Sequence, residues 1–248
     1  GEGEAIPFTQ FKVVESKRED IVVEKYAKSL SLESVSKWGA TVAIEKTDDA
    51  FMVELQNKVL KDFYTFLKTG TLKGTQKKWQ KALAIAKGAV LNKFAGMNRN
   101  VTEVVGFANV MDFYDWLGDK EITVQTMFGL QYIKDFFGFS TLFLLPDDYI
   151  PAKTVIATPV ENIDLYYIDP GDSDFKKLGL DYTTSGETNL IGFHAGGNYT
   201  NATGETYAIM GMKLWAEYLD GVCVVTVGAT ETIPEVSSAV SKVSSNGK

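Results

Sequence analysis

The sequence predicts an α+β fold, and three observations carry that prediction. Apolar residues recur at steps of three and four over residues 49–68, which indicates one long amphipathic helix. Short apolar strands alternate with helical segments over residues 101–169, as in an α/β layer. Two extended runs, 189–195 and 205–218, flank a glycine-rich tip and predict a long C-terminal hairpin. A compact core does not need arms this long, so we expect part of the hairpin to meet another chain.

The first 45 residues are expected to project from the core. Residues 1–14 have no helical period, and we expect an extended arm in which Ile6, Phe8 and Phe11 dock on another surface. Residues 15–45 are rich in charge, and alternation within 29–35 and 40–44 predicts the strands of a projecting hairpin. The first residue, Gly1, fits proteolytic maturation of a longer chain, although any other trimming would leave the same start.

Two helices are expected next. The first, 49–68, has Asp48 or Asp49 as its N-terminal cap and Gly70 in its C-terminal turn. Its apolar stripe consists of Met52, Leu55, Val59, Phe63 and Phe66. The second helix, 76–94, has Thr75 as its cap. Its apolar face consists of Trp79, Leu83, Ala86, Val90 and Phe94.

The rest of the chain alternates between the two kinds of element. A buried strand at 101–109 precedes a short helix at 112–117 that ends at Gly118, and a further helix is expected at 125–137, ending at Gly138. Strands are expected at 139–146, 154–159 and 163–169, and a final short strand at 221–227. A serine-rich tail, 237–248, closes the chain and is expected to dock weakly.

Composition excludes several functional classes. The formal net charge of −7 argues against a protein that holds nucleic acid through its overall charge. No apolar run approaches the roughly 18 residues that span a bilayer, so no membrane partner is expected. A single cysteine, Cys223, excludes an internal disulfide and any cysteine-rich metal site, and its apolar surroundings favour a buried structural role.

Catalytic and ligand-binding motifs are missing or weak. The single histidine, His194, lies in an alternating run and favours a structural hydrogen bond over acid–base catalysis. No phosphate-binding glycine motif occurs. The acidic phrases at 147–148 and 172–174 could ligate Ca²⁺, but they lack the spacing of an EF-hand and favour solvated turns. We therefore predict no catalytic residues, no metal and no cofactor. Three Asn-x-Thr triplets, at Asn100, Asn198 and Asn201, match the glycosylation pattern by chance.

The order of these elements resembles that of the HK97-fold major capsid proteins of tailed bacteriophages, along nearly the whole chain. The phrase VVGFANVMDFYDWLG, residues 104–118, resembles the strand–Asn–helix phrase of their axial domain. The run from FLLPDDYIP to LYYID resembles the loop and strands that follow it. The resemblance implies an N-arm at 1–14, an E-loop at 15–47, and a spine helix with a second helix at 48–100. It further implies an axial domain at 101–175, peripheral strands at 176–220, and a final axial strand and tail at 221–248.

The resemblance implies a non-enzymatic structural function. The mature chain would assemble into hexamers and pentamers of an icosahedral head around double-stranded DNA, contacted non-specifically by an acidic inner surface. It would be a virion protein assembled in the host cytoplasm, with portal protein and scaffolding or decoration proteins as further partners. Residues expected at contacts between subunits are Arg18, Lys25, Lys28, Trp38, Asn198 and Asn201. Lys25, Lys28 or Lys37 and Asn198 or Asn201 are also of the types that form the covalent Lys–Asn crosslinks of some shells, whereas solvated lysines are the simpler interpretation.

Two alternatives stay open. An encapsulin-type shell would keep the fold and enclose cargo protein instead of DNA. A small α/β hydrolase or sugar-binding protein would need carboxylates that converge in a cleft, and no spacing in the sequence brings such a pair together.

Overall fold

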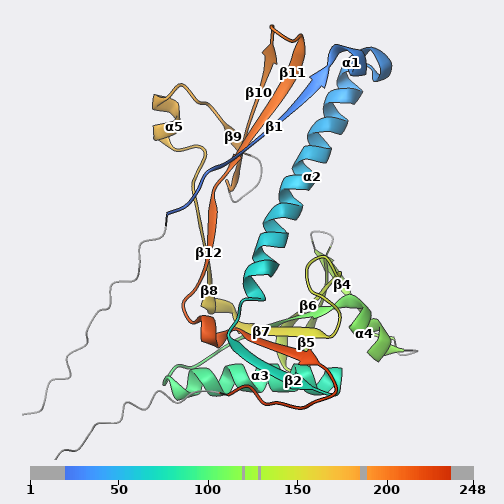
Figure 1. The fold of residues 1–248 in the computed structure, drawn as a ribbon, viewed down its shortest axis with the longest axis vertical. Coiled ribbons are helices and arrows are strands. Elements are labelled where there is room, and N and C mark those ends of the chain that lie inside the picture. Colours follow the sequence, from blue (N-terminus) through green and yellow to red (C-terminus); the bar gives the residue numbers. More distant parts are fainter. Residues whose placement is uncertain (1–19, 119–120, 128–129, 185–188, 236–248) are drawn as a thin grey trace, which may run out of the picture.

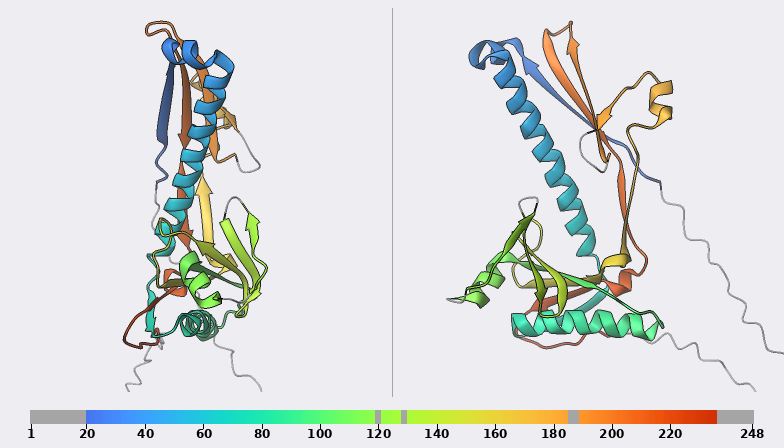
Figure 2. Two further views of the ribbon diagram at one scale, coloured as in Figure 1. Left: turned by 90° about the vertical axis from the view of Figure 1, so that its right-hand side faces the viewer. Right: turned by 180° about the vertical axis from the view of Figure 1, so that it is seen from behind.

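One long helix joins two sheet units of different size. The computed structural model describes residues 20–118, 121–127, 130–184 and 189–235; the expected N-arm, Arg18 and the serine-rich tail lie outside these ranges. Helix α2 (Ala40–Leu67) runs from a four-stranded sheet at one end to a seven-stranded sheet at the other (Figure 1). We call these the small unit and the large unit. A two-stranded ribbon runs beside α2, and the molecule is narrow when turned by 90° (Figure 2).

The large unit is built on a mixed sheet. Its strands, in spatial order, are β2 (Leu72–Gln76), β13 (Cys223–Val227), β7 (Thr154–Pro159), β3 (Val104–Asn109), β6 (Phe139–Leu145), β5 (Leu130–Phe136) and β4 (Gln125–Met127). Strand β13 pairs in parallel with β2, and β3 pairs in parallel with β6, while the other pairs are antiparallel. Segments that lie far apart in the sequence therefore meet in one sheet.

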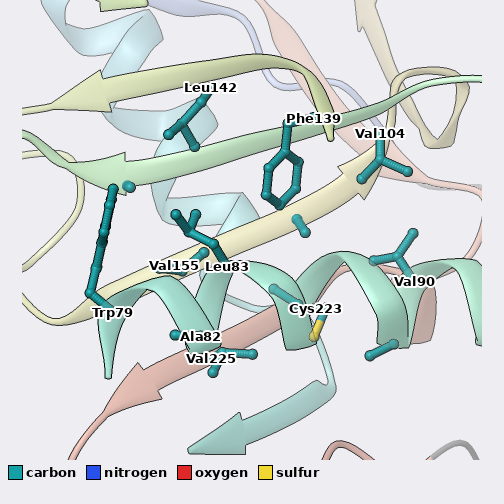
Figure 3. Packing of buried hydrophobic residues seen from close by; sticks show 14 of the residues in the cluster. Trp79, Ala82, Leu83, Val90, Val104, Phe139, Leu142, Val155, Cys223 and Val225 are labelled. Atoms are coloured by element: carbon teal, nitrogen blue, oxygen red, sulfur yellow. The ribbon is translucent and has the colours of Figure 1, made fainter. Parts of the chain in front are cut away.

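Helix α3 (Trp79–Gly96) covers one face of this sheet (Figure 3). All five residues of its predicted apolar face are buried, so that prediction is confirmed. Helix α4 (Val110–Leu117) extends the same core with Phe113 and Leu117. The side chain of Asn109 caps α4 by accepting a hydrogen bond from the Met111 N–H at 2.9 Å.

The end of α2 packs on the opposite face of the sheet. Tyr64 and Leu67 are buried there against Phe107, and Val222 lies in the same cluster. Gly70 follows α2 where the chain passes Val222, and a Cβ at Gly70 would lie 2.5 Å from the carbonyl oxygen of Val222. A side chain at position 70 would therefore separate α2 from the sheet.

The small unit has a thinner core. Its sheet order is β1 (Glu24–Ser31), β11 (Thr203–Met210), β10 (Ile191–Asn198) and β9 (Thr183–Thr184). The first half of α2 packs on this sheet through Phe51 and Leu55. A short helix, α1 (Leu32–Trp38), links β1 to α2, and Gly39, at φ 81°, makes the break between the two helices.

The ribbon connects the two units. It consists of β8 (Ile163–Tyr167) and β12 (Met212–Ala216), and short 3₁₀ turns, η1 (Val160–Asn162) and η2 (Leu219–Gly221), tie it to the large unit. Helix α5 (Ser173–Lys177) follows β8. The buried Asn162 side chain donates to the Tyr218 carbonyl oxygen and accepts from the Tyr218 N–H, both at 2.9 Å. This double hydrogen bond fixes the base of the ribbon.

Three predicted elements are wrong in type. The strand expected at 29–35 ends at Ser31 and is followed by α1, and β1 pairs with β11 in the small unit in place of a projecting hairpin. The helix expected at 125–137 is instead β4 and β5, because Tyr132 and Ile133 pair with Phe143 and Leu142 of β6. The strand expected at 40–44 is the beginning of α2, so neither Asp48 nor Asp49 caps that helix. Extending a helix that already exists adds one hydrogen bond for each residue fixed, which favours helix over an unpaired strand here.

Two further predictions need adjustment. The arm expected at 205–218 is two strands in different sheets, separated at Gly211, where a Cβ would lie 3.0 Å from Ile168 and 3.2 Å from the Val22 carbonyl oxygen. Helix α3 begins at Trp79 because the preceding residues form β2, which the sequence analysis missed. Lys78 therefore occupies the N-cap position in place of Thr75.

Candidate assembly surfaces

The tip of the β10–β11 hairpin is an exposed polar loop with one aromatic residue. The Tyr199 side chain is 100% exposed, and Ala202 has a positive φ of 48°. Asn198 is held within the loop: its amide donates to Glu205 at 2.8 Å, and its oxygen accepts from the Thr200 N–H at 3.0 Å. Asn201 is exposed in the same loop. The structure thus brings the two predicted asparagines together at one end of the molecule.

The predicted lysines lie on opposite faces of β1. Lys28 faces α2, where its Nζ lies 2.7 Å from Glu54 and 5.1 Å from the centre of the Phe51 ring. Lys25, three residues away in a strand, faces the other side of the sheet and is exposed. Lys28 therefore has a partner within its own chain.

The side chains of the two remaining predicted contact residues, Trp38 and Arg18, lie outside the described part of the structure. Trp38 ends α1, but its side chain is outside what the structure describes. Arg18 precedes the described residues altogether.

Both faces of the ribbon carry exposed apolar side chains, a feature that the sequence analysis missed. Leu165 pairs with Leu214 on one face, while Tyr166 and Trp215 occupy the other. Leu165, Tyr166 and Trp215 are 44%, 53% and 41% exposed. The run LYY of β8 and the pair LW of β12 were the sequence features that could have indicated this apolar surface. A two-stranded sheet is marginally stable in water by itself, so an uncovered apolar ribbon is best explained by a contact with another molecule.

An apolar groove runs beside the ribbon. Its volume is about 230 Å³. The lining residues come from the end of α2, from β3 and from the ribbon, and they are almost all apolar: Phe63, Val105, Phe107, Thr158, Pro159, Val160, Ile163, Leu165 and Leu214. The groove is continuous with the face of the ribbon that carries Leu165 and Leu214, while Tyr166 and Trp215 lie on the opposite face.

Carboxylates gather around α4. Asp112 accepts a hydrogen bond from the Lys153 backbone N–H, and Asp147 accepts one from the Asn109 amide at 2.7 Å. Burial raises the pKa of Asp112, the bond from Lys153 opposes that rise, and the charges of Asp115 and Asp147 add to it. Since Asp112 and Asp147 are hydrogen-bonded to neighbouring loops, the arrangement stabilises the local chain.

The second acidic phrase is also engaged locally. Asp172 caps α5 by accepting from the Asp174 N–H at 3.1 Å, and Asp174 forms an ion pair with Lys177 at 2.8 Å. Among the described residues, no group of three or more His, Cys, Asp or Glu side chains could hold a metal ion.

The two residues with the most reactive side-chain chemistry lie apart from each other. His194 is exposed, and its Nδ1 lies 3.0 Å from the backbone oxygen of Asp181. Cys223 is fully buried in β13, and burial raises the pKa of its thiol to about 12. Within the described part of the chain, no helix has the length and apolar character needed to cross a membrane.

Comparisons by sequence are negative: no protein-family model matches the chain, and a search of curated proteins finds no match.

Comparisons by structure find shell proteins. The holo-SrpI encapsulin complex of Synechococcus elongatus matches with a TM-score of 0.52 and 11% identity, over 87% of this chain and 78% of that one. A chain of Mycobacterium phage Che8 matches with a TM-score of 0.54 and 9% identity, over 90% of this chain and 78% of that one. The virus-like particle of Pyrococcus furiosus matches with a TM-score of 0.50 and 13% identity, over 86% and 79%.

These matches extend over most of each chain and show the fold. The protein has an α+β, HK97-like capsid fold, as the order of its sequence elements predicted.

Proposed function

We propose that this chain is the major capsid protein of a tailed bacteriophage, assembling through hexamers and pentamers into an icosahedral head that encloses double-stranded DNA. The observation that carries the proposal is the combination of an HK97-like fold with a large apolar surface, the ribbon and its groove, that the described chain leaves uncovered. A subunit whose apolar surface is completed by neighbours has this property. No catalytic role is proposed.

The domain assignments of the sequence analysis are part of this proposal, with bounds changed to those of the structural elements. The axial domain corresponds to the large unit, which gathers 72–159 and β13. Strand β8 and helix α5 lie outside the seven-stranded sheet, so we assign them to the peripheral domain together with the small unit. Helix α2 is the spine helix, and residues 20–39 form the described part of the E-loop.

The contact residues are proposed on the same basis. Lys25 and the exposed Asn201 are free to meet a neighbour, and Trp38 and Arg18 stay as proposed contacts from the sequence. Lys28 and Asn198 already have partners in their own chain, so a change at either position would disturb the subunit as well as a contact. The Lys25→Glu variant therefore tests assembly more cleanly than Lys28→Glu.

Electron microscopy tests the proposal directly. We expect negative-stain images of the purified protein to contain rings of five and six subunits or closed shells. A Leu165→Glu/Leu214→Glu variant should keep its fold, since Leu165 is exposed and Leu214 partly so, and should lose at least about tenfold in particle yield because charge is placed on the apolar ribbon. Val53→Glu, at an exposed position of α2, is the control. Dispersed monomers of the unaltered protein at high concentration would contradict the proposal.

An encapsulin-type shell is a second candidate, since a match of equal quality is an encapsulin complex. Particles purified from the native source distinguish the two. Nuclease-resistant double-stranded DNA inside them would support the phage head, and a co-purifying cargo protein without DNA would support the encapsulin.

A further inference from the structure

Charge is strongly segregated along the sequence from the end of α2 to the beginning of α5. Residues 63–102, which include β2 and α3, contain eight Lys or Arg and no Asp or Glu. Residues 103–174, which include α4 and most of the remaining strands, contain thirteen Asp or Glu and only three Lys. In a chain of net charge −7, these neighbouring segments therefore carry +8 and −10. Overall composition does not reveal this opposition.

The basic segment presents one exposed lysine cluster, which we call the basic face. Lys73, Lys77, Lys78 and Lys81 lie on β2 and at the beginning of α3. Only Lys81 forms an ion pair in the described chain, with Glu231 at 3.0 Å. By contrast, Lys93 and Arg99 near the other end of α3 are neutralised by Asp220 and Glu217. The unpaired charge is therefore concentrated at one end of α3.

This arrangement is unfavourable for an isolated subunit. The N-terminus of α3 carries the positive end of the helix dipole, no acidic residue occupies its first turn, and the N-cap residue Lys78 makes no side-chain cap hydrogen bond. Glu231 of the same chain offsets part of this charge, since Lys81 and Lys77 lower the pKa of its carboxyl. Carboxylates supplied by another chain would offset the rest.

The acidic segment presents the matching surface, which we call the acidic face. Asp112, Asp115, Asp147 and Asp148 lie on α4 and on the loop before β7, and none of the ion pairs of the described chain uses them. Met111 and Tyr114, 64% and 41% exposed, flank Asp115 on α4. The exposed side of α3 carries Ala84, Gly88 and Leu91, which would allow another helix to approach closely.

The two faces adjoin one corner of the large unit. Helix α3 runs along the bottom of the unit and α4 lies at its side (Figure 1). The first residue of α3, Trp79, contacts Trp116 of α4 with ring centres 5.6 Å apart. Two complementary faces that diverge from one edge form a wedge. Joining the basic face of one copy to the acidic face of the next makes a heterologous contact, and such contacts form a ring when the rotation from one copy to the next closes.

We infer that the basic face of one copy docks on the acidic face of the next copy, α3 against α4, and that this contact builds the capsomer ring. The partner is a second copy of this chain, and the inference rests on the proposed function. Charge complementarity fixes the direction of docking around the ring, while the small and apolar residues of α3 and α4 supply the close contact.

Charge reversal on each face provides the test. The basic-face variant is Lys77→Glu/Lys78→Glu, and the acidic-face variant is Asp115→Lys/Asp148→Lys; all four side chains are exposed. Each variant should reduce the assembled fraction at least about tenfold, because it cancels the net charge of its face and sets like charges against each other at the two altered positions. The variant that combines all four changes should recover rings and shells. Lys176→Glu/Lys177→Glu, on α5, makes the same change in net charge as the basic-face variant and should assemble normally.

An equal mixture of the two single-face variants gives a sharper result. At the altered positions, every contact in an alternating ring of the two variants would again join opposite charges. Only rings with an even number of subunits can alternate. We expect six-membered rings to return while five-membered rings and closed shells do not. Particle images and native mass spectrometry of the mixture would measure this.

The outcomes separate the inference from the proposed function. If the unaltered protein assembles and both face variants assemble equally well, the inference is wrong and the proposed function stands. If the basic-face variant forms normal shells but binds less of a 40-base-pair DNA duplex than the α5 control does, the lysines face nucleic acid and the inference is overturned. If the unaltered protein never assembles, the proposed function itself fails.

Discussion

The large and small units bury their apolar residues to different extents. In the large unit, a cluster of twenty buried residues lies between α3 and the sheet, and a second cluster of eight lies on the other face. The small unit has a single cluster of five, held between α2 and one face of its sheet. Since buried apolar area is the main stabilising contribution, the large unit can fold on its own core, whereas the small unit depends on α2.

Polar interactions are also more deeply buried in the large unit than in the small unit. In the large unit the fully buried Asn109 and the buried Asn162 bind backbone groups. In the small unit the polar contacts are half-exposed ion pairs, such as Lys28–Glu54 and Lys58–Glu24. Exposed ion pairs contribute only about 0–1 kcal/mol each. The small unit is thus the less firmly held of the two units.

Removing a large side chain from the core of the large unit should have the greatest effect. Phe113 is fully buried, with its ring centre 6.2 Å from that of Trp79 and 5.9 Å from that of Phe136. Phe113→Ala should lower the free energy of unfolding by about 3–5 kcal/mol. Urea unfolding would measure the loss, and labelling of the buried Cys223 thiol should accelerate in parallel. Leu91→Ala, on the exposed side of α3, should cost less than about 0.5 kcal/mol.

A matching change in the small unit should act locally. Phe51 is 2% exposed and packs edge-on against Phe193 with ring centres 6.2 Å apart. Phe51→Ala should cost about 3 kcal/mol, at the low end for such a substitution, because the surrounding core is thin. Hydrogen exchange should lose protection in β10 and β11 but not in α3 or β7. Equal loss in α3 would mean that the units unfold together, contrary to the comparison.

The buried amide of Asn109 should contribute less than either aromatic ring. Its Nδ2 donates to the Ile150 carbonyl oxygen at 2.8 Å and its Oδ1 caps α4. Asn109→Ala should cost about 2 kcal/mol, from the lost cap and the unpaired carbonyl. Asn109→Ser, which can still cap, should lower the free energy of unfolding by less in the same urea titration. Asn92→Ala, at an exposed position of α3, should leave that free energy unchanged. An equal cost for the Ala and Ser variants would show that the cap contributes nothing.

The smallest effect is a pH dependence confined to the small unit. A hydrogen bond from Tyr26 lowers the pKa of Glu24, burial opposes this, and Lys58 lowers it further. A lowered pKa in the folded state stabilises the fold above the ordinary glutamate pKa and is lost as pH falls through the lowered value. Between pH 6 and 3 the small unit should lose no more than about 1 kcal/mol, because Glu24 is partly exposed.

Hydrogen exchange of β1 and β11 at the two pH values would measure this loss. Glu24→Gln should reduce the dependence in β1, while hydrogen bonds from Tyr207 and Asn198, which lower the pKa of Glu205, leave a remaining part in β11. Glu33→Gln, at an exposed position of α1, should leave the dependence unchanged.

Local sequence patterns were sufficient to predict several of the helices and strands. The apolar face of α3 and the strands 104–109, 139–145 and 154–159 were predictable, because their periodicity or apolar character is intrinsic to the segment. The same is true of Gly118, which follows the last residue of α4 with a positive φ of 55°. The overall order of elements was likewise enough to indicate the fold.

Segments whose structure depends on a distant partner were not predictable. β5 has an apolar pattern that also fits a helix, and only its pairing with β6 makes it a strand. β2 became a strand because β13, about 150 residues later in the chain, lies beside it. Asp48 was expected to cap a helix, yet it lies within α2 and accepts a hydrogen bond from Thr206 at 3.2 Å.

Some properties of the candidate surfaces follow from the sequence, and others follow only from the tertiary structure. The sequence by itself determined the α+β class, the order of elements, and which residue types could serve at contacts, because these follow from local periodicity and side-chain chemistry. Only the tertiary structure decided that Lys28 is already paired, that the ribbon is left uncovered, and that the basic and acidic segments adjoin one corner. The exposure of a side chain and the placing of opposite charges near each other depend on which segments lie side by side. Long-range packing determines which segments these are.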